Sequence, residues 1–252
     1  SYLMHQAKNH LIGGITGGIG SELAVNLSAG GDRVAGYARK AAVGDSFSPQ
    51  DNFVLKTCDA TEPETLETVI NEFQKELGSI DSYTHAIGSI YLRPAHLTPV
   101  EDWLQTIQTN LSSAFYALRS VTKIMSKQGY GSCLFFSTAA AQTGIANHEA
   151  IAAAKGGIEA MVRAAAASYA SRGLRINAIA PSLTDTPLSQ AIVGSEQALE
   201  ISKRMHPTGA IGEASDVASL AAWLHSDQAK FVTGQTFVID GGISKIVPKP
   251  KA

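Results

Sequence analysis

The 252-residue chain has 44% hydrophobic residues, enough to bury one large core, and its net charge is −2. So weak a charge argues against nucleic acid or an anionic membrane as a partner. The two cysteines, Cys58 and Cys133, lie in apolar stretches and are expected to be reduced core thiols. No apolar run reaches the about 18 residues of a membrane span, and the N-terminus lacks a signal-peptide pattern. We therefore expect a soluble, cytoplasmic protein.

Short apolar runs alternate with helical periodicity along the chain. In chain order, the runs predict strands at His10–Gly13, Arg33–Tyr37, Phe53–Thr57, Tyr83–Ile87, Ser132–Ser137, Arg175–Ala180 and Thr236–Asp240. The segments between them predict helices near Ile19–Ser28, Pro63–Leu77, Val100–Lys127, His148–Ser171 and Ser215–Ser226. This alternation predicts an α/β Rossmann fold, a doubly wound seven-stranded parallel sheet with helices on both faces. Because no repeat or composition break interrupts residues 1–252, a single domain is the simplest organisation.

The first predicted strand runs directly into a glycine-rich turn. Gly14, Gly18 and Gly20 have the GxxxGxG spacing, which lets a backbone turn tightly and approach a pyrophosphate. The helix that begins near Ile19 points its amide groups and the positive end of its dipole at such an anion. A tight strand–helix turn alone would also need glycines, but this context favours a dinucleotide site. Its expected contacts are Gly14, Thr16, Gly18 and Ile19.

The second predicted strand ends in Tyr37-Ala38-Arg39-Lys40, where a cation stands instead of a carboxylate. A site that prefers NAD usually carries an acidic residue at this point, which binds the ribose hydroxyls. Arg39 can bind a 2′-phosphate through its planar guanidinium, with Lys40 as a second positive charge. We therefore expect NADP(H) to be favoured over NAD(H), although an ordinary solvated basic pair would look the same in the sequence.

Further motifs follow in a fixed order. They are Cys58-Asp59-Ala60, His85-Ala86-Ile87-Gly88, Asn110-Leu111-Ser112-Ser113-Ala114, Ile151-Ala152-Ala153-Ala154-Lys155-Gly156-Gly157, Arg175-Ile176-Asn177-Ala178-Ile179-Ala180-Pro181, Thr233-Gly234-Gln235 and Asp240-Gly241-Gly242. Together with the glycine turn, they resemble the short-chain dehydrogenase/reductase family over roughly residues 11–244. Three places depart from the family pattern: the NNAG motif keeps only Gly88, YxxxK has Ile151 in place of tyrosine, and Ser182 replaces the glycine of RVNxxxPG.

The resemblance implies cofactor-binding roles for several residues. It places Asp59 and Ala60 at the adenine, Ala86 beside the cofactor, and Thr186 at the nicotinamide carboxamide. It also implies that Asn110 bends its helix and holds a water leading to Lys155. Two plainer interpretations stay open: Asp59 also suits a cap of the helix that follows, and Asn110 suits a polar helix surface.

The resemblance also implies a catalytic set with one member missing. In the family, a serine polarises the substrate carbonyl, a tyrosine transfers the proton, and a lysine binds the nicotinamide ribose and lowers the tyrosine pKa. By spacing, the serine position is Thr138, whose hydroxyl can still donate a hydrogen bond. Lys155 is in place. Ile151 cannot exchange a proton, so the ordinary route is absent.

His148 is the best candidate for a replacement donor. It lies seven residues before Lys155, so on a helix the two share nearly the same face. Divergent enoyl-thioester reductases of the same superfamily place their tyrosine at that wider spacing. Histidine titrates near neutral pH, but a helix N-terminus disfavours its cation, and the neutral ring has one N–H to donate. A surface histidine in the first helical turn is the plainer interpretation.

The helix after His148 is rich in alanine, which allows close approach of another backbone. The family commonly packs this helix against its copy, so the resemblance implies a homodimer or homotetramer, and packing within one chain is the alternative. Residues 182–205 resemble the family's substrate-covering segment and carry apolar side chains that suit a small-molecule pocket. The sequence predicts no metal site.

Three functions are compatible with these observations. The first is an NADP(H)-dependent oxidoreductase that acts on a carbonyl, a hydroxyl or an activated double bond with a non-standard proton donor. The second is a dinucleotide-binding sensor or subunit that has lost dehydrogenase chemistry. The third is a lyase or isomerase reaction on the same fold, because fold does not fix function. The intact Asn110, Lys155 and Thr186 set favours the first.

Overall fold

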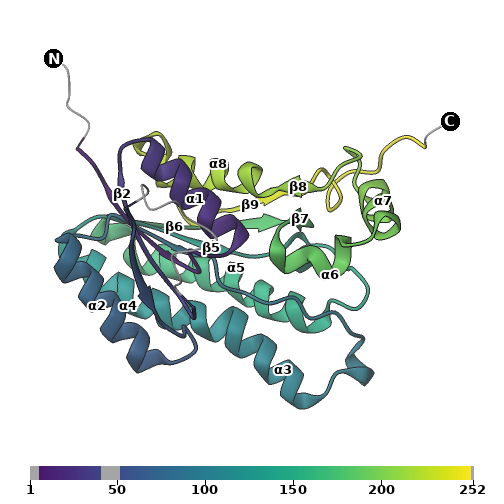
Figure 1. The fold of residues 1–252 in the computed structure, drawn as a ribbon, viewed down its shortest axis with the longest axis horizontal. Helices are drawn as coiled ribbons and strands as arrows, with labels where there is room; N and C mark the ends of the chain where they lie inside the picture. The colour runs from purple at the N-terminus through teal and green to yellow at the C-terminus, as the bar shows by residue number, and fades with distance from the viewer. Residues whose placement is uncertain (1–5, 41–51, 251–252) are drawn as a thin grey trace.

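The computed structural model describes residues 6–40 and 52–250, and its centre is a seven-stranded parallel sheet (Figure 1). All seven predicted strands are confirmed: β1 Asn9–Gly13, β2 Arg33–Ala38, β3 Val54–Thr57, β4 Ser82–His85, β5 Gly131–Phe136, β6 Leu174–Pro181 and β9 Thr236–Ile239. Their order in the sheet is β3-β2-β1-β4-β5-β6-β9. The chain starts in the middle of the sheet, builds one half outward, and then crosses to β4 to build the other half. This doubly wound order leaves a switch point between β1 and β4, where such folds bind ligands.

Helices cover both faces of the sheet, as the alternation predicts (Figure 1). One face carries α1 (Gly18–Ala29) and α8 (Ala214–His225), which pack against each other over an apolar cluster around Ile12 and Leu134. The other face carries α2 (Pro63–Leu77), α4 (Ser113–Gln128) and α5 (Glu149–Tyr169) over a cluster around Leu11 and Phe135. Because strand side chains alternate between faces, neighbours such as Leu11 and Ile12 fill opposite clusters. Short 3₁₀ turns lie at Ala95–Leu97, Ala139–Ala141, Ala170–Arg172 and Asp227–Ala229.

The helix predicted at Val100–Lys127 is divided rather than uniform. It consists of α3 (Val100–Ile107), a π-helical segment at Gln108–Ser112, and α4. Helical periodicity cannot reveal one wider turn, because the apolar positions on either side still recur at helical spacing. The π segment contains Asn110, the residue expected to bend the helix, and π bulges are a recognised cause of kinks.

The chain between β6 and α8 forms a separate layer beyond the end of the sheet (Figure 1). It contains β7 (Thr184–Asp185), a 3₁₀ turn at Pro187–Ser189, α6 (Gln190–Val193), α7 (Glu196–Met205) and β8 (Gly212–Glu213). β7 and β8 pair in parallel, which returns the end of α7 to the end of β6. No helix in residues 6–40 and 52–250 is long and apolar enough to cross a membrane.

A chain of polar side chains crosses the core beside the switch point. The Tyr37 and Tyr83 hydroxyls are 2.5 Å apart, and Tyr83 Oη lies 2.7 Å from His85 Nδ1. His85 Nε2 in turn lies 2.9 Å from the Ser113 hydroxyl, which donates to the Thr109 carbonyl. Burial lowers the pKa of His85 to about 3, so its ring is neutral. His85, which stands at the first position of the family's NNAG motif, is therefore held in a chain of hydrogen bonds.

Candidate functional site

A cavity of about 380 Å³ opens at the carboxyl ends of β4, β5 and β6, beside the N-terminus of α1. Its wall is mostly apolar, and several polar groups converge in it. Eight of the residues predicted from the sequence line it: Gly18, Ile19, Ala86, Asn110, Thr138, His148, Lys155 and Thr186. The predicted residues outside this lining are Gly14, Thr16, Arg39, Lys40, Asp59 and Ala60. The latter group surrounds the turns after β1, β2 and β3, the expected end for an adenosine half.

The glycine turn after β1 leaves no room for side chains. Gly14 has φ +76°, and a Cβ there would lie 2.3 Å from the Ala86 carbonyl oxygen. A Cβ on Gly20 would lie 2.3 Å from the Gly14 oxygen, and one on Gly18 would lie 2.9 Å from the Thr186 Cβ. The turn is thus close-packed on one side, while Gly17, Gly18 and Ile19 present the first turn of α1 to the cavity. Amide groups at such a helix start suit a pyrophosphate.

Arg39 and Lys40 are exposed directly after β2. The neighbouring strand β3 is followed by Asp59, whose Oδ1 accepts hydrogen bonds from the Thr61 amide at 2.9 Å and the Thr61 hydroxyl at 2.7 Å. These bonds, together with the Arg39 charge, lower the pKa of Asp59 against the effect of burial. Asp59 therefore stabilises the turn before α2 through Oδ1, but it is not the cap of that helix, because the N-cap of α2 is Glu62. Ala60 is buried beneath it.

Asn110 is fixed by the loop after β4. Its Oδ1 accepts from the Ser89 amide at 3.0 Å, and its Nδ2 donates to the Ser89 hydroxyl at 3.0 Å and to the Thr106 carbonyl at 2.9 Å. A Cβ on Gly88 would lie 2.9 Å from that Oδ1 and 3.6 Å from Lys155 Nζ. The one residue retained from the family's NNAG motif is thus the one that lets the asparagine and the lysine approach the same backbone.

Lys155 is a buried cation on α5. Its side chain is 9% exposed, and Nζ donates to the Phe136 carbonyl at 2.9 Å. Burial lowers the pKa of Lys155 to about 8. Nζ has three donor positions, and the Phe136 carbonyl takes one of them. The ammonium group faces the cavity, and no carboxylate among residues 6–40 and 52–250 forms an ion pair with it, which suits binding of neutral hydroxyl groups.

Thr138, at the start of the 3₁₀ turn after β5, and Ile151, on α5, face the same cavity. The Thr138 hydroxyl oxygen accepts from the Ala140 amide at 3.3 Å, so its own hydrogen remains available to a ligand. Ile151 is 5% exposed and lies one turn before Lys155 on α5. The position that would carry a phenol in the resembling family is therefore apolar and packed, although it lines the cavity.

His148 is the N-cap of α5, and the residue before it, Asn147, has φ +67°. His148 Nδ1 lies 2.9 Å from the Ala146 carbonyl oxygen. A carbonyl oxygen only accepts, so Nδ1 carries the proton of the neutral ring and Nε2 is left as an acceptor. The single N–H expected to reach a substrate is therefore already bonded to the backbone.

Thr186 follows β7 in the layer that covers the cavity. It caps the 3₁₀ turn at Pro187–Ser189 in a reciprocal arrangement with Ser189, whose hydroxyl lies 3.1 Å from the Thr186 amide. Leu183, Leu188 and Ile192 from the same layer complete the apolar wall. The apolar pocket expected from this segment is therefore present, and Thr186 lies directly over the first turn of α1.

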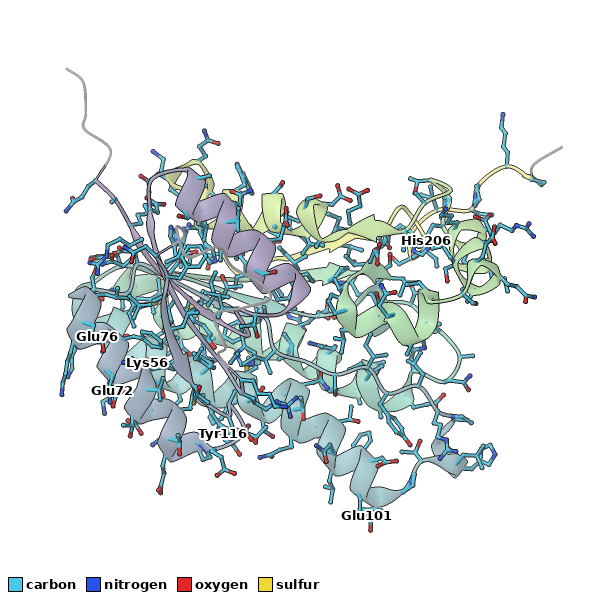
Figure 2. The ribbon with its side chains drawn as sticks, viewed as in Figure 1. Lys56, Glu72, Glu76, Glu101, Tyr116 and His206 are labelled. Carbon is cyan, nitrogen blue, oxygen red and sulfur yellow. The ribbon has the colours of Figure 1, made fainter. Side chains whose placement is uncertain are left out.

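Ser182 and His206 form a contact that the sequence did not predict. Ser182 Oγ and His206 Nε2 are 2.8 Å apart, and His206 Nδ1 lies 2.7 Å from the Ser202 carbonyl oxygen. In the sequence, Ser182 differs from the glycine of the family motif, and no motif or spacing marks His206. Twenty-four positions separate them, and only the return of the chain after α7 brings them together. Figure 2 places His206 beside α7, far from the Lys56–Glu76 ion pair at the other end of the molecule.

A second cavity of about 200 Å³ adjoins the first. The two share Leu92, Thr138, His148, Ser182, Leu183 and Ile192. His206 and Ser202 line only the second, together with apolar residues such as Met205 and Ile243. Ser182 therefore lies on the wall between them, and a ligand in the first cavity can reach its hydroxyl.

Comparisons with known proteins agree with this geometry. Residues 14–244 match the family described as enoyl-(acyl carrier protein) reductase. The chain is 28% identical over 242 residues to the 3-oxoacyl-[acyl-carrier-protein] reductase FabG of Escherichia coli K12, covering 94% of this chain and 98% of that protein. It is 30% identical over 258 residues to 2-(S)-hydroxypropyl-CoM dehydrogenase 3 of Xanthobacter autotrophicus, covering 97% of this chain and all of that protein.

Solved structures give the same result. The structure of ElxO with NADP bound has a TM-score of 0.89 at 25% identity, covering 94% of this chain and 99% of that one. A short-chain dehydrogenase/reductase from Mycobacterium ulcerans has a TM-score of 0.86 at 26% identity, covering 95% and 90%. Since the family match spans nearly the whole chain and the fold agrees throughout, this protein belongs to the short-chain dehydrogenase/reductase family of NAD(P)-dependent oxidoreductases.

Proposed function

We propose that this chain is an NADP(H)-dependent reductase or dehydrogenase of a small molecule, working without a tyrosine proton donor. The observation that carries the proposal is the convergence of Lys155, Asn110 and Thr138 on one cavity that also receives the first turn of α1. A scaffold that only held a nucleotide would need the ammonium for the ribose but would not need the Thr138 hydroxyl and a mostly apolar cavity beside it. The reacting group is a carbonyl, its alcohol, or an activated double bond.

The residues present fit a dinucleotide. The glycines at 14, 18 and 20 stand where any Cβ would collide, so the backbone itself forms a cradle for a pyrophosphate at the start of α1. Arg39 and Lys40 would hold a 2′-phosphate, Asp59 and Ala60 the adenine side, and Gly14, Thr16, Gly18 and Ile19 the pyrophosphate. Ala86, Lys155 and Thr186 would hold the nicotinamide half. When bound, the nicotinamide supplies or accepts the hydride.

The chain's own groups prepare the substrate oxygen. The free hydroxyl hydrogen of Thr138 can donate to a carbonyl oxygen in the cavity. The Lys155 ammonium adds positive charge in an apolar surrounding, where an electrostatic interaction is stronger than in water. Asn110 keeps the loop with Gly88 and Ser89 in place beside Nζ. The apolar residues of the covering layer exclude water from the reacting atoms.

The proton must come from a group other than residue 151. His148 lines the cavity and is the candidate that the sequence favours. With Nδ1–H bonded to Ala146, its neutral ring can accept a proton at Nε2, which suits oxidation of an alcohol. It can donate toward the cavity only as an imidazolium, and its place at the N-terminus of α5 opposes that charge.

Cofactor titration tests the proposal. NADPH should bind the unmodified protein more tightly than NADH, because Ala38 offers no carboxylate and Arg39 is exposed for a phosphate. Arg39→Ala should weaken NADPH binding about tenfold or more, with little effect on NADH, since a charge-assisted hydrogen bond contributes about 1.5–3 kcal/mol. Lys230→Ala, at an exposed position after α8, is a matched loss of charge. Equal affinities for the two cofactors in the unmodified protein contradict the NADP preference.

A nucleotide-binding sensor or subunit is the second candidate function, and the apolar Ile151 in the cavity is the observation that favours it. Such a protein binds NADPH and reduces no carbonyl compound. Turnover by the unmodified protein therefore separates the two candidates, whereas NADPH affinity does not.

Self-association is part of the proposal. The outward face of α5 carries exposed small residues, among them Ala160, Ala164 and Ala167, and α4 beside it exposes Phe115. A flat face of this kind lets two helices approach closely, so we infer a homodimer, or a tetramer built from dimers. Ala164→Glu should lower the mass measured by light scattering. A concentration-independent monomer in the unmodified protein contradicts this inference.

A further inference from the structure

Ser182 and His206 are arranged as a proton-transfer pair rather than as an ordinary core contact. The Ser202 carbonyl can only accept, so His206 Nδ1 carries a proton, and the neutral ring's Nε2 must be an acceptor. The Ser182 hydroxyl is therefore the donor in the 2.8 Å bond to Nε2. The serine oxygen can accept a hydrogen bond from a substrate hydroxyl in the first cavity, or its O–H can turn to donate to a substrate carbonyl, while the imidazole behind it takes or returns the proton.

His206 lies at the end of a helix and close to a carboxylate. His206 is the C-cap of α7, at the negative end of that helix's dipole, and it bonds a carbonyl of the last turn. Asp240, after β9, interacts electrostatically with it. Burial by itself would raise the pKa of Asp240, but hydrogen bonds from Ser244 and Gly242, with the His206 charge, hold it below its usual value. Apart from His206, the only titratable residue among those lining the second cavity is His148.

We propose that Ser182, backed by His206, delivers the proton in place of the missing tyrosine. The inference rests on the proposed oxidoreductase function, from which it takes the hydride. In reduction, a hydride from the reduced nicotinamide forms a C–H bond as the C=O π bond breaks. The substrate oxygen takes the Ser182 hydroxyl proton, and the His206 imidazolium returns its Nε2 proton to Ser182. The substrate gains one hydride, which carries two electrons, and one further proton, and His206 ends neutral. Oxidation of an alcohol is the same sequence reversed.

The position of the pair explains why Ser182 stands where the family motif has glycine. Ser182 lies on the wall between the two cavities, so its side chain connects His206, in the second cavity, to a group in the first. His206 is 5% exposed, and without Ser182 its Nε2 would face an apolar cavity unpaired. Serine is small enough to leave the first cavity open.

The test uses four variants with NADPH and two ketones, cyclohexanone and acetophenone. Ser182→Ala removes the hydroxyl, and Ser182→Thr keeps it. His206→Asn keeps an N–H that can reach the Ser202 carbonyl but cannot carry the proton. His96→Asn, on an exposed 3₁₀ turn outside both cavities, is the matched control. Ser182→Ala and His206→Asn should each lower kcat about 10²-fold, within the usual contribution of a positioned acid of about 10²–10⁴, with NADPH affinity and KM nearly unchanged. His206→Asn should also remove a limb of the pH profile of kcat.

A second measurement needs neither cofactor nor ketone. Nitrogen NMR of the histidine-labelled protein should show His206 with its proton on Nδ1 and a hydrogen-bonded, unprotonated Nε2 in alkaline solution. That Nε2 signal should move in Ser182→Ala and stay close to its original position in Ser182→Thr. An unchanged signal in Ser182→Ala shows that the pair does not exist in solution and overturns the inference.

The outcomes separate this inference from the proposed function. Unmodified protein that reduces the ketones, with kcat unaffected by Ser182→Ala and His206→Asn, overturns the relay and leaves the oxidoreductase function intact. Equal losses of kcat in Ser182→Ala and Ser182→Thr assign the contact a structural role and also overturn it. Unmodified protein that binds NADPH and reduces neither ketone overturns the carbonyl relay, and a lack of turnover with ketones, alcohols and activated double bonds alike overturns the oxidoreductase function as well. A selective loss in Ser182→Ala and His206→Asn, with recovery in Ser182→Thr, establishes the relay.

Discussion

His148 and His206 both border the second cavity and hold their rings in the same way, yet they cap opposite ends of helices. In each, Nδ1 is bonded to a backbone carbonyl, which leaves Nε2 facing inward. His148 stands at the start of α5, where the helix dipole opposes a positive charge, and it is partly exposed. His206 stands at the end of α7, is buried, and has Asp240 nearby.

The difference teaches that closeness to Lys155 in the sequence is a poor guide to which histidine handles the proton. His148 shares a helix with the lysine, but its helix end and its bond to Ala146 leave it an acceptor. His206 comes from a different element, and the return of the chain after α7 places its Nε2 against the Ser182 hydroxyl and the ring close to the Asp240 carboxylate.

Restoring tyrosine at position 151 should give the largest change in the rate of ketone reduction and should make proton transfer independent of both histidines. Ile151→Tyr places a phenol one turn from Lys155 and across the cavity from Thr138. Ketone reduction should rise by one to several factors of ten, within the about 10²–10⁴ that a positioned acid supplies. In that background, His206→Asn should cost little. If the double variant falls as far as His206→Asn alone does, the phenol has not replaced the relay, and the position assigned to the missing tyrosine is wrong.

Lys155→Met removes the buried ammonium that lines the first cavity and so tests how strongly that site is shielded from water. Folding lowers the pKa of Lys155 from 10.5 to about 8, so the unfolded chain binds more protons between those values, and this group's contribution to stability rises with pH there. The unmodified protein should therefore gain stability relative to Lys155→Met from near pH 7 to near pH 10, by roughly 3 kcal/mol at most. Urea denaturation at both pH values measures it. A stability difference that does not change with pH would mean that the ammonium is solvated.

Asp240→Asn tests whether the surroundings of His206 matter. The amide can still accept a hydrogen bond at one oxygen, but it lacks the charge that stabilises an imidazolium. We expect a loss of kcat of roughly fivefold, about 1 kcal/mol, with the same variant in the His206→Asn background giving no further loss. Steady-state kinetics of both single variants and the double variant give the coupling. Additive losses would place the effect of Asp240 in the fold of its turn rather than at His206.

His148→Ala should have the smallest effect. With its N–H bonded to Ala146 and the helix dipole opposing its charge, removing the ring should change ketone reduction by no more than about threefold, as expected for a side chain outside the proton path. NADPH affinity should not change. A loss as large as that of Ser182→Ala would reverse the comparison and assign proton transfer to the histidine on α5.

Much of the fold follows from local pattern. Seven apolar runs of strand length predict all seven strands, because a parallel sheet covered on both faces needs continuous apolar segments. The glycine turn and the start of α1 are equally local, since the spacing of Gly14, Gly18 and Gly20 is fixed by a single strand–helix connection. The π segment around Asn110 is not predictable from periodicity, because a single wider turn leaves the apolar spacing on either side helical.

The candidate site divides in the same way. Asn110, Thr138, Lys155 and Thr186 belong to motifs that follow one another in a fixed order along the sequence, and the structure brings them to one cavity. The Ser182–His206 contact depends on how α7 and the β7–β8 pairing return the chain, which is a tertiary arrangement with no local signature. The sequence signal that could have pointed to it was the serine in a motif position reserved for glycine, since a side chain there needs a partner.

The buried tyrosines beside the switch point make the intact fold visible to ultraviolet light. Burial raises the pKa of Tyr37 and Tyr83 well above that of an ordinary phenol, and their hydroxyls bond each other and His85. In alkaline solution, exposed tyrosines become phenolate and absorb at longer wavelength, while Tyr37 and Tyr83 keep their protons until the sheet unfolds. The late part of an alkaline absorbance titration is therefore a label-free report on whether β2 and β4 are still sealed against solvent.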